Sequence, residues 1–143
     1  MQDKKPKADL NSAKNFGMTA LMYVATKGGL SKTKNLLDHG AKVNLVDVDG
    51  WTALMYATRW GCLDIVKCLA ENGANINLVD KKGWTALVHA AYGNKLDVVK
   101  CLLKCGAKVE VADEYGLTAL NYAEGNGNME IVRCLSTNAR VEC

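Results

Sequence analysis

The sequence predicts an all-α solenoid of helix-turn-helix units with short β-turn hairpins at their tips. The main signal is the pattern Gly-x-Thr-Ala-Leu, which begins at Gly17, Gly50, Gly83 and Gly116 and so recurs every 33 residues. A fixed period of this size is typical of stacked units that bury one continuous core between neighbours. The 143-residue chain is 49% hydrophobic and 23% charged, which is the composition of a folded rather than a disordered protein.

Each unit is predicted to open with a tight turn and a short helix. An Asp followed by Gly three residues later favours the turn, and the Thr two residues after that Gly can cap a helix by accepting a backbone N–H. A Gly or Asn nine residues after the Thr ends the helix, because both adopt the left-handed conformation at little cost. The predicted caps are Thr19, Thr52, Thr85 and Thr118, and the predicted helix ends are Gly28, Gly61, Asn94 and Gly127.

A second helix follows in each unit. Within residues 63–69, the apolar positions 63, 65, 66 and 69 form one buried stripe at helical spacing, and residues 96–103 and 129–135 repeat the pattern. Glycine or asparagine again ends the helix, at Gly40, Gly73, Gly106 and Asn138. Most glycines therefore serve the backbone, which argues against a phosphate-binding role for them.

The order of these signals resembles the ankyrin repeat: Asp-x-x-Gly-x-Thr-x-Leu, then Ala-Ala, then Gly, then a hydrophobic second helix that closes on Gly-Ala. The resemblance is specific because four copies keep one period. Two family positions differ, and we expect the fold to tolerate both changes. The usual Pro after the Thr is Ala20, Ala53, Ala86 and Ala119, and the usual His two residues further on is Met22, Met55, Val88 and Asn121.

The predicted organisation is a basic tail, residues 1–7, which we expect to be disordered, followed by one ankyrin repeat domain, residues 8–143. The four units span approximately residues 14–46, 47–79, 80–112 and 113–143. Residues 8–13 align with the last third of a unit whose helices are missing. We therefore expect that the chain is a segment of a longer polypeptide, or that its first helix pair is contributed from elsewhere.

Composition also limits the location and the partners. The net charge is +3, but the tail holds three Lys and one Asp, so the body is nearly neutral and nucleic-acid binding by bulk charge is not favoured. No apolar run is long enough to span a bilayer, and no secretory signal is visible. Cys68, Cys101 and Cys134 recur at the repeat period, about 8–10 Å apart on stacked helices, which is too far for disulfides. We expect reduced thiols and an intracellular, cytoplasmic protein.

The sequence offers no catalytic, cofactor or metal site. His39 and His89 are the only histidines, and neither lies in a zinc-binding or triad pattern. Cys101 and Cys105 share a helical face, but no further ligand stands at a suitable spacing. The segment 125–127 lacks the Gly-Lys-Ser/Thr ending of a phosphate loop. We therefore predict that the protein is not an enzyme.

The resemblance implies that partners bind the concave surface formed by the turn tips and the exposed face of each first helix. All nine Phe, Trp and Tyr residues fall on this surface, and such side chains dominate interface hot spots. Tyr23, Tyr56 and Tyr122 either bind or pack between the first helices, whereas binding is favoured for Trp51 and Trp84. The predicted partner-binding residues are Phe16, Met18, Trp51, Arg59, Trp60, Lys81, Lys82, Trp84, Tyr92, Tyr115 and Leu117.

The predicted function is a monomeric protein-interaction module or scaffold that binds one or more partner proteins. The basic residues beside the aromatic strip suit an acidic peptide with hydrophobic anchors, or they are ordinary solvated lysines. Three alternatives stay open. The strip could bind a nucleotide or single-stranded nucleic acid, or a methylated lysine in an aromatic cage, or the array could be a spacer in a larger regulatory protein.

Overall fold

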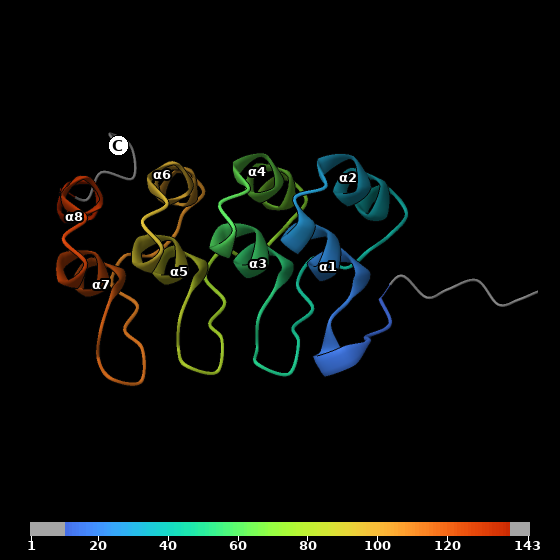
Figure 1. Ribbon diagram of the computed structural model, residues 1–143, viewed down its shortest axis with the longest axis horizontal. Coiled ribbons are helices and arrows are strands. Elements are labelled where there is room, and N and C mark those ends of the chain that lie inside the picture. Colours follow the sequence, from blue (N-terminus) through green and yellow to red (C-terminus); the bar gives the residue numbers. More distant parts are fainter. Residues whose placement is uncertain (1–10, 138–143) are drawn as a thin grey trace, which may run out of the picture.

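The computed structural model describes residues 11–137, and these form two layers of short helices (Figure 1). The turns between units extend from the first layer on the side away from the second (Figure 1). No strand is present in this part of the chain, which confirms the predicted all-α solenoid. The first layer contains α1 (Ala20–Lys27), α3 (Ala53–Arg59), α5 (Ala86–Tyr92) and α7 (Ala119–Gly125). The second contains α2 (Leu30–Asp38), α4 (Leu63–Glu71), α6 (Leu96–Lys104) and α8 (Met129–Ser136), and a short 3-10 helix, η1 (Asn15–Gly17), lies in the first turn.

The helices of the first layer begin where the threonines predict. Each Thr hydroxyl accepts a hydrogen bond from the backbone N–H three residues ahead, at 3.2 Å in the first three units and 3.4 Å in the last. In the last unit, Asn121 takes the place of the usual His, and its Oδ1 accepts from the Thr118 N–H at 2.9 Å. The cap thus survives the departure from the family pattern.

The same helices end at the predicted left-handed residues. Gly28, Gly61 and Gly127 have φ angles of 78°, 70° and 72°. Asn94 has a φ of 58° and replaces the glycine in the third unit, as asparagine does more readily than most residues. These local signals position both layers and the sharp connection between them.

The core lies between the two layers and between successive units. Ile65, Val66 and Leu69 of α4 are fully buried, as the apolar stripe predicts, whereas Leu63 is half-buried. Met22 and Met55 are also buried, because they project from the first layer into the space shared with the next helix.

Successive turns lie close enough to form backbone hydrogen bonds. The Val48 N–H donates to the Phe16 carbonyl and the Lys81 N–H to the Asp49 carbonyl, both at 3.0 Å. At Gly83, which has a φ of 84°, a β-carbon would lie 2.9 Å from the Asp113 Cα, so only glycine allows this approach. The turns are therefore held in a fixed register along the array.

Asparagines at the repeat period link the loops that follow the second layer. Asn44 Oδ1 accepts from the Asn75 N–H at 2.7 Å, and Asn77 Oδ1 accepts from the Lys108 N–H at 2.9 Å. Asn44 and Asn77 also donate through Nδ2 to the carbonyls of Gly73 and Gly106, each at 3.2 Å. Both ends of each unit are thus tied to the next unit by polar contacts.

Several expectations fall outside the described residues. The basic tail 1–7, the start of the domain at residue 8, the helix end at Asn138 and the thiol of Cys143 belong to the segments 1–10 and 138–143. Within residues 11–137, no helix is long and apolar enough to cross a lipid bilayer.

Candidate functional site

The candidate site is an open groove on the concave side of the second, third and fourth units, with a volume of about 1000 Å³. Its floor comes from the helices of the first layer, and one rim comes from the turn tips. Six predicted binding residues line it: Trp51, Arg59, Lys81, Lys82, Trp84 and Tyr92. The aromatic anchors of two successive turns are therefore brought to one surface.

The aromatic rings form a continuous row along the floor of this groove. Trp51 lies between Tyr56 and His89, with ring centroids 4.9 and 4.5 Å apart. Trp84 lies 5.0 Å from His89 and 4.9 Å from Tyr122, and all these pairs are tilted by 49–60°. Tilted contacts of this kind stabilise aromatic pairs beyond their simple burial. Tyr56 and Tyr122 each pack against a tryptophan and also line the groove, and their role in binding stays a prediction.

A buried aspartate holds each ring to its turn. In the third unit, Asp80 Oδ1 accepts from the backbone N–H groups of Lys82 and Trp84, at 2.9 and 3.0 Å. The Asp80 Oδ2 lies 2.9 Å from Nε2 of His89, nine residues ahead. Since a carboxylate only accepts hydrogen bonds, this arrangement places the imidazole proton on Nε2. One side chain thus fixes the turn and the orientation of a ring in the floor.

The neighbouring units repeat this arrangement with tyrosine. The hydroxyl of Tyr56 donates to Asp47 Oδ2, and the hydroxyl of Tyr122 donates to Asp113 Oδ2. The indole Nε1 of Trp84 reaches from the third unit to the same Asp113 oxygen, at 3.1 Å. The floor is therefore set by side-chain hydrogen bonds within and between units.

The protonation states follow from these surroundings. Burial lowers the pKa of His89 below its usual 6.5; the bond to Asp80 opposes this shift, while Arg59 and Lys82 add to it. Burial and the bond to Asp47 raise the pKa of Tyr56 above its usual value. The rings of His89 and Tyr56 are thus uncharged at pH 7.

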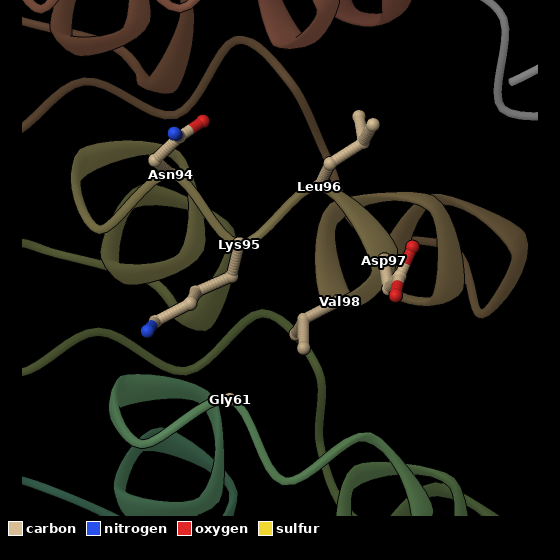
Figure 2. Close-up of a pocket in the computed structure, with 6 residues that line it drawn as sticks. All are labelled: Gly61, Asn94, Lys95, Leu96, Asp97 and Val98. Atoms are coloured by element: carbon tan, nitrogen blue, oxygen red, sulfur yellow. The ribbon is translucent and has the colours of Figure 1, made fainter.

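Four cationic side chains surround this uncharged floor. The Arg59 Cζ lies 6.0 Å from the Trp51 ring centroid, and the Lys82 Nζ lies 6.0 Å from the Trp84 ring centroid. Lys81 is exposed at the turn tip. Lys95 precedes α6, and its side chain extends toward the ribbon at Gly61 (Figure 2). The groove thus carries cations on two rims. Lys81 and Lys82 lie at the turn tips, and Arg59 and Lys95 lie at or after the ends of α3 and α5.

Lys95 depends on a glycine in the neighbouring unit. A β-carbon at Gly61 would lie 3.3 Å from the Lys95 Cδ, so the absence of a side chain there makes room for the lysine stem. A second, smaller hollow of about 260 Å³ contains both residues (Figure 2). Lys95 is half-buried and borders this hollow as well as the groove, so its position is more restricted than that of an ordinary surface lysine.

Five predicted binding residues lie outside this groove. Phe16 and Tyr115 are highly exposed at the first and last turns, and Trp60 is exposed directly after α3. Met18 is half-buried against the core, and Leu117 is exposed after the last turn. Their role in binding remains a prediction.

Sequence reasoning missed two groove residues that matter. Lys95 stands where the other units have Gly29, Cys62 and Asn128, so comparison at the repeat period could have singled it out. The sequence pattern predicts Asp80 only as a turn residue. Its spacing of nine residues to His89 recurs between Asp47 and Tyr56, and in both units the structure joins the two side chains.

The thiols lie in the second layer, away from the groove. Cys62, Cys68, Cys101 and Cys105 are free thiols. Burial and then the neighbouring Cys105 raise the pKa of Cys101 to about 11, so this sulfur is a thiol rather than a reactive thiolate at pH 7. Within residues 11–137, no three His, Cys, Asp or Glu side chains are grouped so that they could hold a metal ion.

Comparison with known families gives one match. The family described as ankyrin repeats, in three copies, matches residues 4–80 and 73–143. The two segments together cover nearly the whole chain. The structure contains four helix pairs, one more than the three copies of the family description. No curated protein matches the chain.

Proposed function

Because the chain belongs to the ankyrin repeat family, whose members are generally protein–protein interaction modules, we propose that it binds a partner protein through the aromatic groove. The observation that carries this proposal is the row of rings from Tyr56 to Tyr122, which lines an open surface between cationic rims. Large aromatic side chains at the centre of a surface are typical interaction hot spots.

The rigidity of the floor supports binding rather than a role as a spacer. Asp47, Asp80 and Asp113 hold the rings through hydrogen bonds that are buried in the third unit and partly buried in the other two, so little side-chain entropy is lost when a partner binds. Tyr92 adds a ring that is 54% exposed beside this floor. A spacer needs neither feature. The free thiols suit a reducing compartment, and the proposal places the protein inside the cell.

The groove fits a methylated lysine less well than a protein with acidic side chains. Four cations surround the rings, namely Arg59, Lys81, Lys82 and Lys95. Among residues 11–137, Asp49 is the one exposed acidic residue that lines the groove, since Asp80 is buried against His89. The charges therefore oppose a cationic ligand.

The test compares two charge-reversal variants in partner capture from the cell of origin, with quantitative mass spectrometry. Lys81→Glu with Lys82→Glu alters the groove, whereas Lys104→Glu with Lys108→Glu alters exposed lysines outside it by the same charge. All four lysines are exposed, so both variants should keep the wild-type circular dichroism. We expect proteins that are retained by wild type and by the control but lost by the groove variant. Identical sets for the two variants would contradict the proposal.

A further inference from the structure

We propose that the partner segment is an acidic, extended peptide whose carboxylates bind the cationic rims while an apolar side chain lies on the aromatic floor. This inference rests on the proposed function and adds the chemistry of the occupant.

The exposed charges that line the groove are mostly positive. Arg59, Lys81, Lys82 and Lys95 line a single concave surface. Of the carboxylates that line it, Asp49 is exposed, whereas Asp80 is buried and already accepts three hydrogen bonds. Asp47 and Asp113, beneath the floor, are also buried and already accept hydrogen bonds from the floor rings. A peptide that brings two or three carboxylates would neutralise charges that the protein leaves uncompensated.

Trp51 has an indole N–H that is open for a hydrogen bond, whereas the indole N–H of Trp84 in the next unit donates within the protein. The Trp84 Nε1–H donates to Asp113, which lies 29 residues ahead. The equivalent acceptor for Trp51 is Asp80, whose Oδ2 lies 2.9 Å from Nε2 of His89, and among the described residues Trp51 does not donate to it. Within residues 11–137, the Trp51 Nε1–H makes no hydrogen bond, and it is not among the buried unpaired atoms. An indole N–H open to solvent beside a guanidinium is a suitable pair of donors for a carboxylate.

The packing of the rings favours a peptide over a nucleic acid. Bases bind single-strand receptors by stacking on free aromatic faces. Here Trp51 is packed between Tyr56 and His89, and Trp84 contacts His89, Tyr92 and Tyr122. The rings therefore form a closed floor on which an aliphatic or aromatic side chain can lie, rather than a set of separate stacking platforms.

The test uses three pools of fluorescent synthetic peptides of about ten residues, which extend over roughly 30 Å. All three carry Leu, Phe or Trp at alternate positions. The positions between them are Glu or Asp in the acidic pool, Gln or Asn in the neutral pool, and Lys or Arg in the basic pool. Fluorescence anisotropy at fixed ionic strength gives the affinity of the wild-type chain for each pool. Oligothymidylate of similar length is the nucleic-acid probe.

We expect the acidic pool to bind at least tenfold more tightly than the neutral pool, and the basic pool to bind weakest. The Lys81→Glu and Lys82→Glu double variant should lose at least tenfold for the acidic pool and gain affinity for the basic pool. The Lys104→Glu and Lys108→Glu control should change neither. Trp51→Phe, which keeps an aromatic ring and removes the indole N–H, should weaken the acidic pool several-fold and leave the neutral pool almost unchanged.

Equal affinity for the acidic and neutral pools would overturn the inference, as would equal losses in the two lysine double variants. Tighter binding of oligothymidylate than of the acidic pool would replace the peptide by a nucleic acid. If peptides bind the groove without regard to charge, the proposed function stands and only the acidic occupant fails. If no pool binds and partner capture does not depend on Lys81 and Lys82, both proposals fail.

Discussion

The first and third units occupy equivalent places in the repeat but fix their turns differently. In the third unit, Asp80 bonds two turn N–H groups and the ring of His89, and both residues are 5% exposed. In the first unit, Lys14 stands at the aspartate position, and the ring nine residues ahead, Tyr23, is 56% exposed. The Nζ of Lys27 lies 5.3 Å from the centroid of the Tyr23 ring.

The backbone of the first turn differs as well. It forms the short 3-10 helix η1, and Phe16 takes a φ of 59°, whereas Asp49 at the same position in the second unit does not have a positive φ. The Lys14 N–H still donates to the Met18 carbonyl at 2.8 Å, as the Asp47 N–H does to the Trp51 carbonyl. The backbone hydrogen bond therefore closes the turn in both units. The aspartate carboxylate, where it is present, sets the shape of the turn and holds the ring nine residues ahead in the groove floor.

Removing the carboxylate of the third unit should have the largest effect. Asp80→Ala leaves the N–H groups of Lys82 and Trp84 and the imidazole of His89 without their acceptor. We expect the free energy of unfolding to fall by about 3 kcal/mol, because hydrogen bonds to a buried charged group are worth more than neutral ones. Urea unfolding followed by circular dichroism measures the change.

The control is Asp49→Ala. The Asp49 carboxylate is exposed and makes no side-chain hydrogen bond among residues 11–137, so its removal should change the unfolding free energy by less than about 0.5 kcal/mol. Equal effects of the two variants would show that the buried hydrogen bonds of Asp80 do not stabilise the fold.

Two buried threonines extend the comparison from the turns to the helices. Thr33 of the first unit and Thr58 of the second are both fully buried, but Thr33 Oγ1 donates to the Gly29 carbonyl at 2.8 Å, whereas Thr58 Oγ1 has no partner within residues 11–137. Thr58→Val replaces an unpaired hydroxyl by a methyl group of similar size. We expect it to raise the unfolding free energy by about 1–2 kcal/mol.

The matched variant Thr33→Val should lower the unfolding free energy by about 1 kcal/mol, since it removes a hydrogen bond that is made. Thermal and urea unfolding of both variants give the sign directly. Stabilisation by both substitutions, or by neither, would contradict the distinction between the two hydroxyls.

The fold could be predicted because its signals are local. The hydroxyl of Thr85 caps the helix that follows it, and Asn94 ends the same helix, through contacts within a few residues. The groove was only partly predictable. Trp51 and Trp84 could be predicted as groove residues because each stands beside a turn glycine. Arg59 could be predicted because it lies on the exposed face of α3.

The remaining features depend on contacts between units, which spacing within one unit does not reveal. Lys95 enters the groove because Gly61 of the preceding unit leaves room for its stem. The Trp51 N–H makes no hydrogen bond among the described residues, whereas the equivalent Trp84 N–H donates to the carboxylate of the next unit. Both features become visible only when neighbouring units are placed side by side.

Adding a carboxylate to the first unit should produce a smaller change than removing one from the third. Lys14→Asp offers acceptors for the backbone N–H groups of Phe16 and Met18 and for the hydroxyl of Tyr23, by analogy with the second unit. We expect a gain in the unfolding free energy of about 0.5–1 kcal/mol, because the exposed turn must be ordered at the same time.

Lys14→Ala is the control, since it removes the lysine without supplying an acceptor. Amide hydrogen exchange of residues 15–23 should slow in Lys14→Asp and not in Lys14→Ala. Equal exchange in the two variants would mean that the carboxylate does not rebuild the turn.

The smallest effect concerns pH and distinguishes the third unit from its neighbours. Because the pKa of His89 is lowered on folding, the unfolded chain binds a proton at a higher pH than the folded chain. Stability should therefore be independent of this group well above pH 6.5 and fall as the pH drops through 6.5 toward the lowered folded pKa.

His89→Tyr makes the third unit resemble the second and fourth, which bond their aspartates through Tyr56 and Tyr122, and removes the titration. We expect the wild type to lose more stability than His89→Tyr between about pH 7.5 and about pH 5.5, a window above the range in which carboxylates titrate. Equal losses of stability in the two proteins would mean that groups other than the His89 imidazole, between Trp51 and Trp84, cause the acid sensitivity.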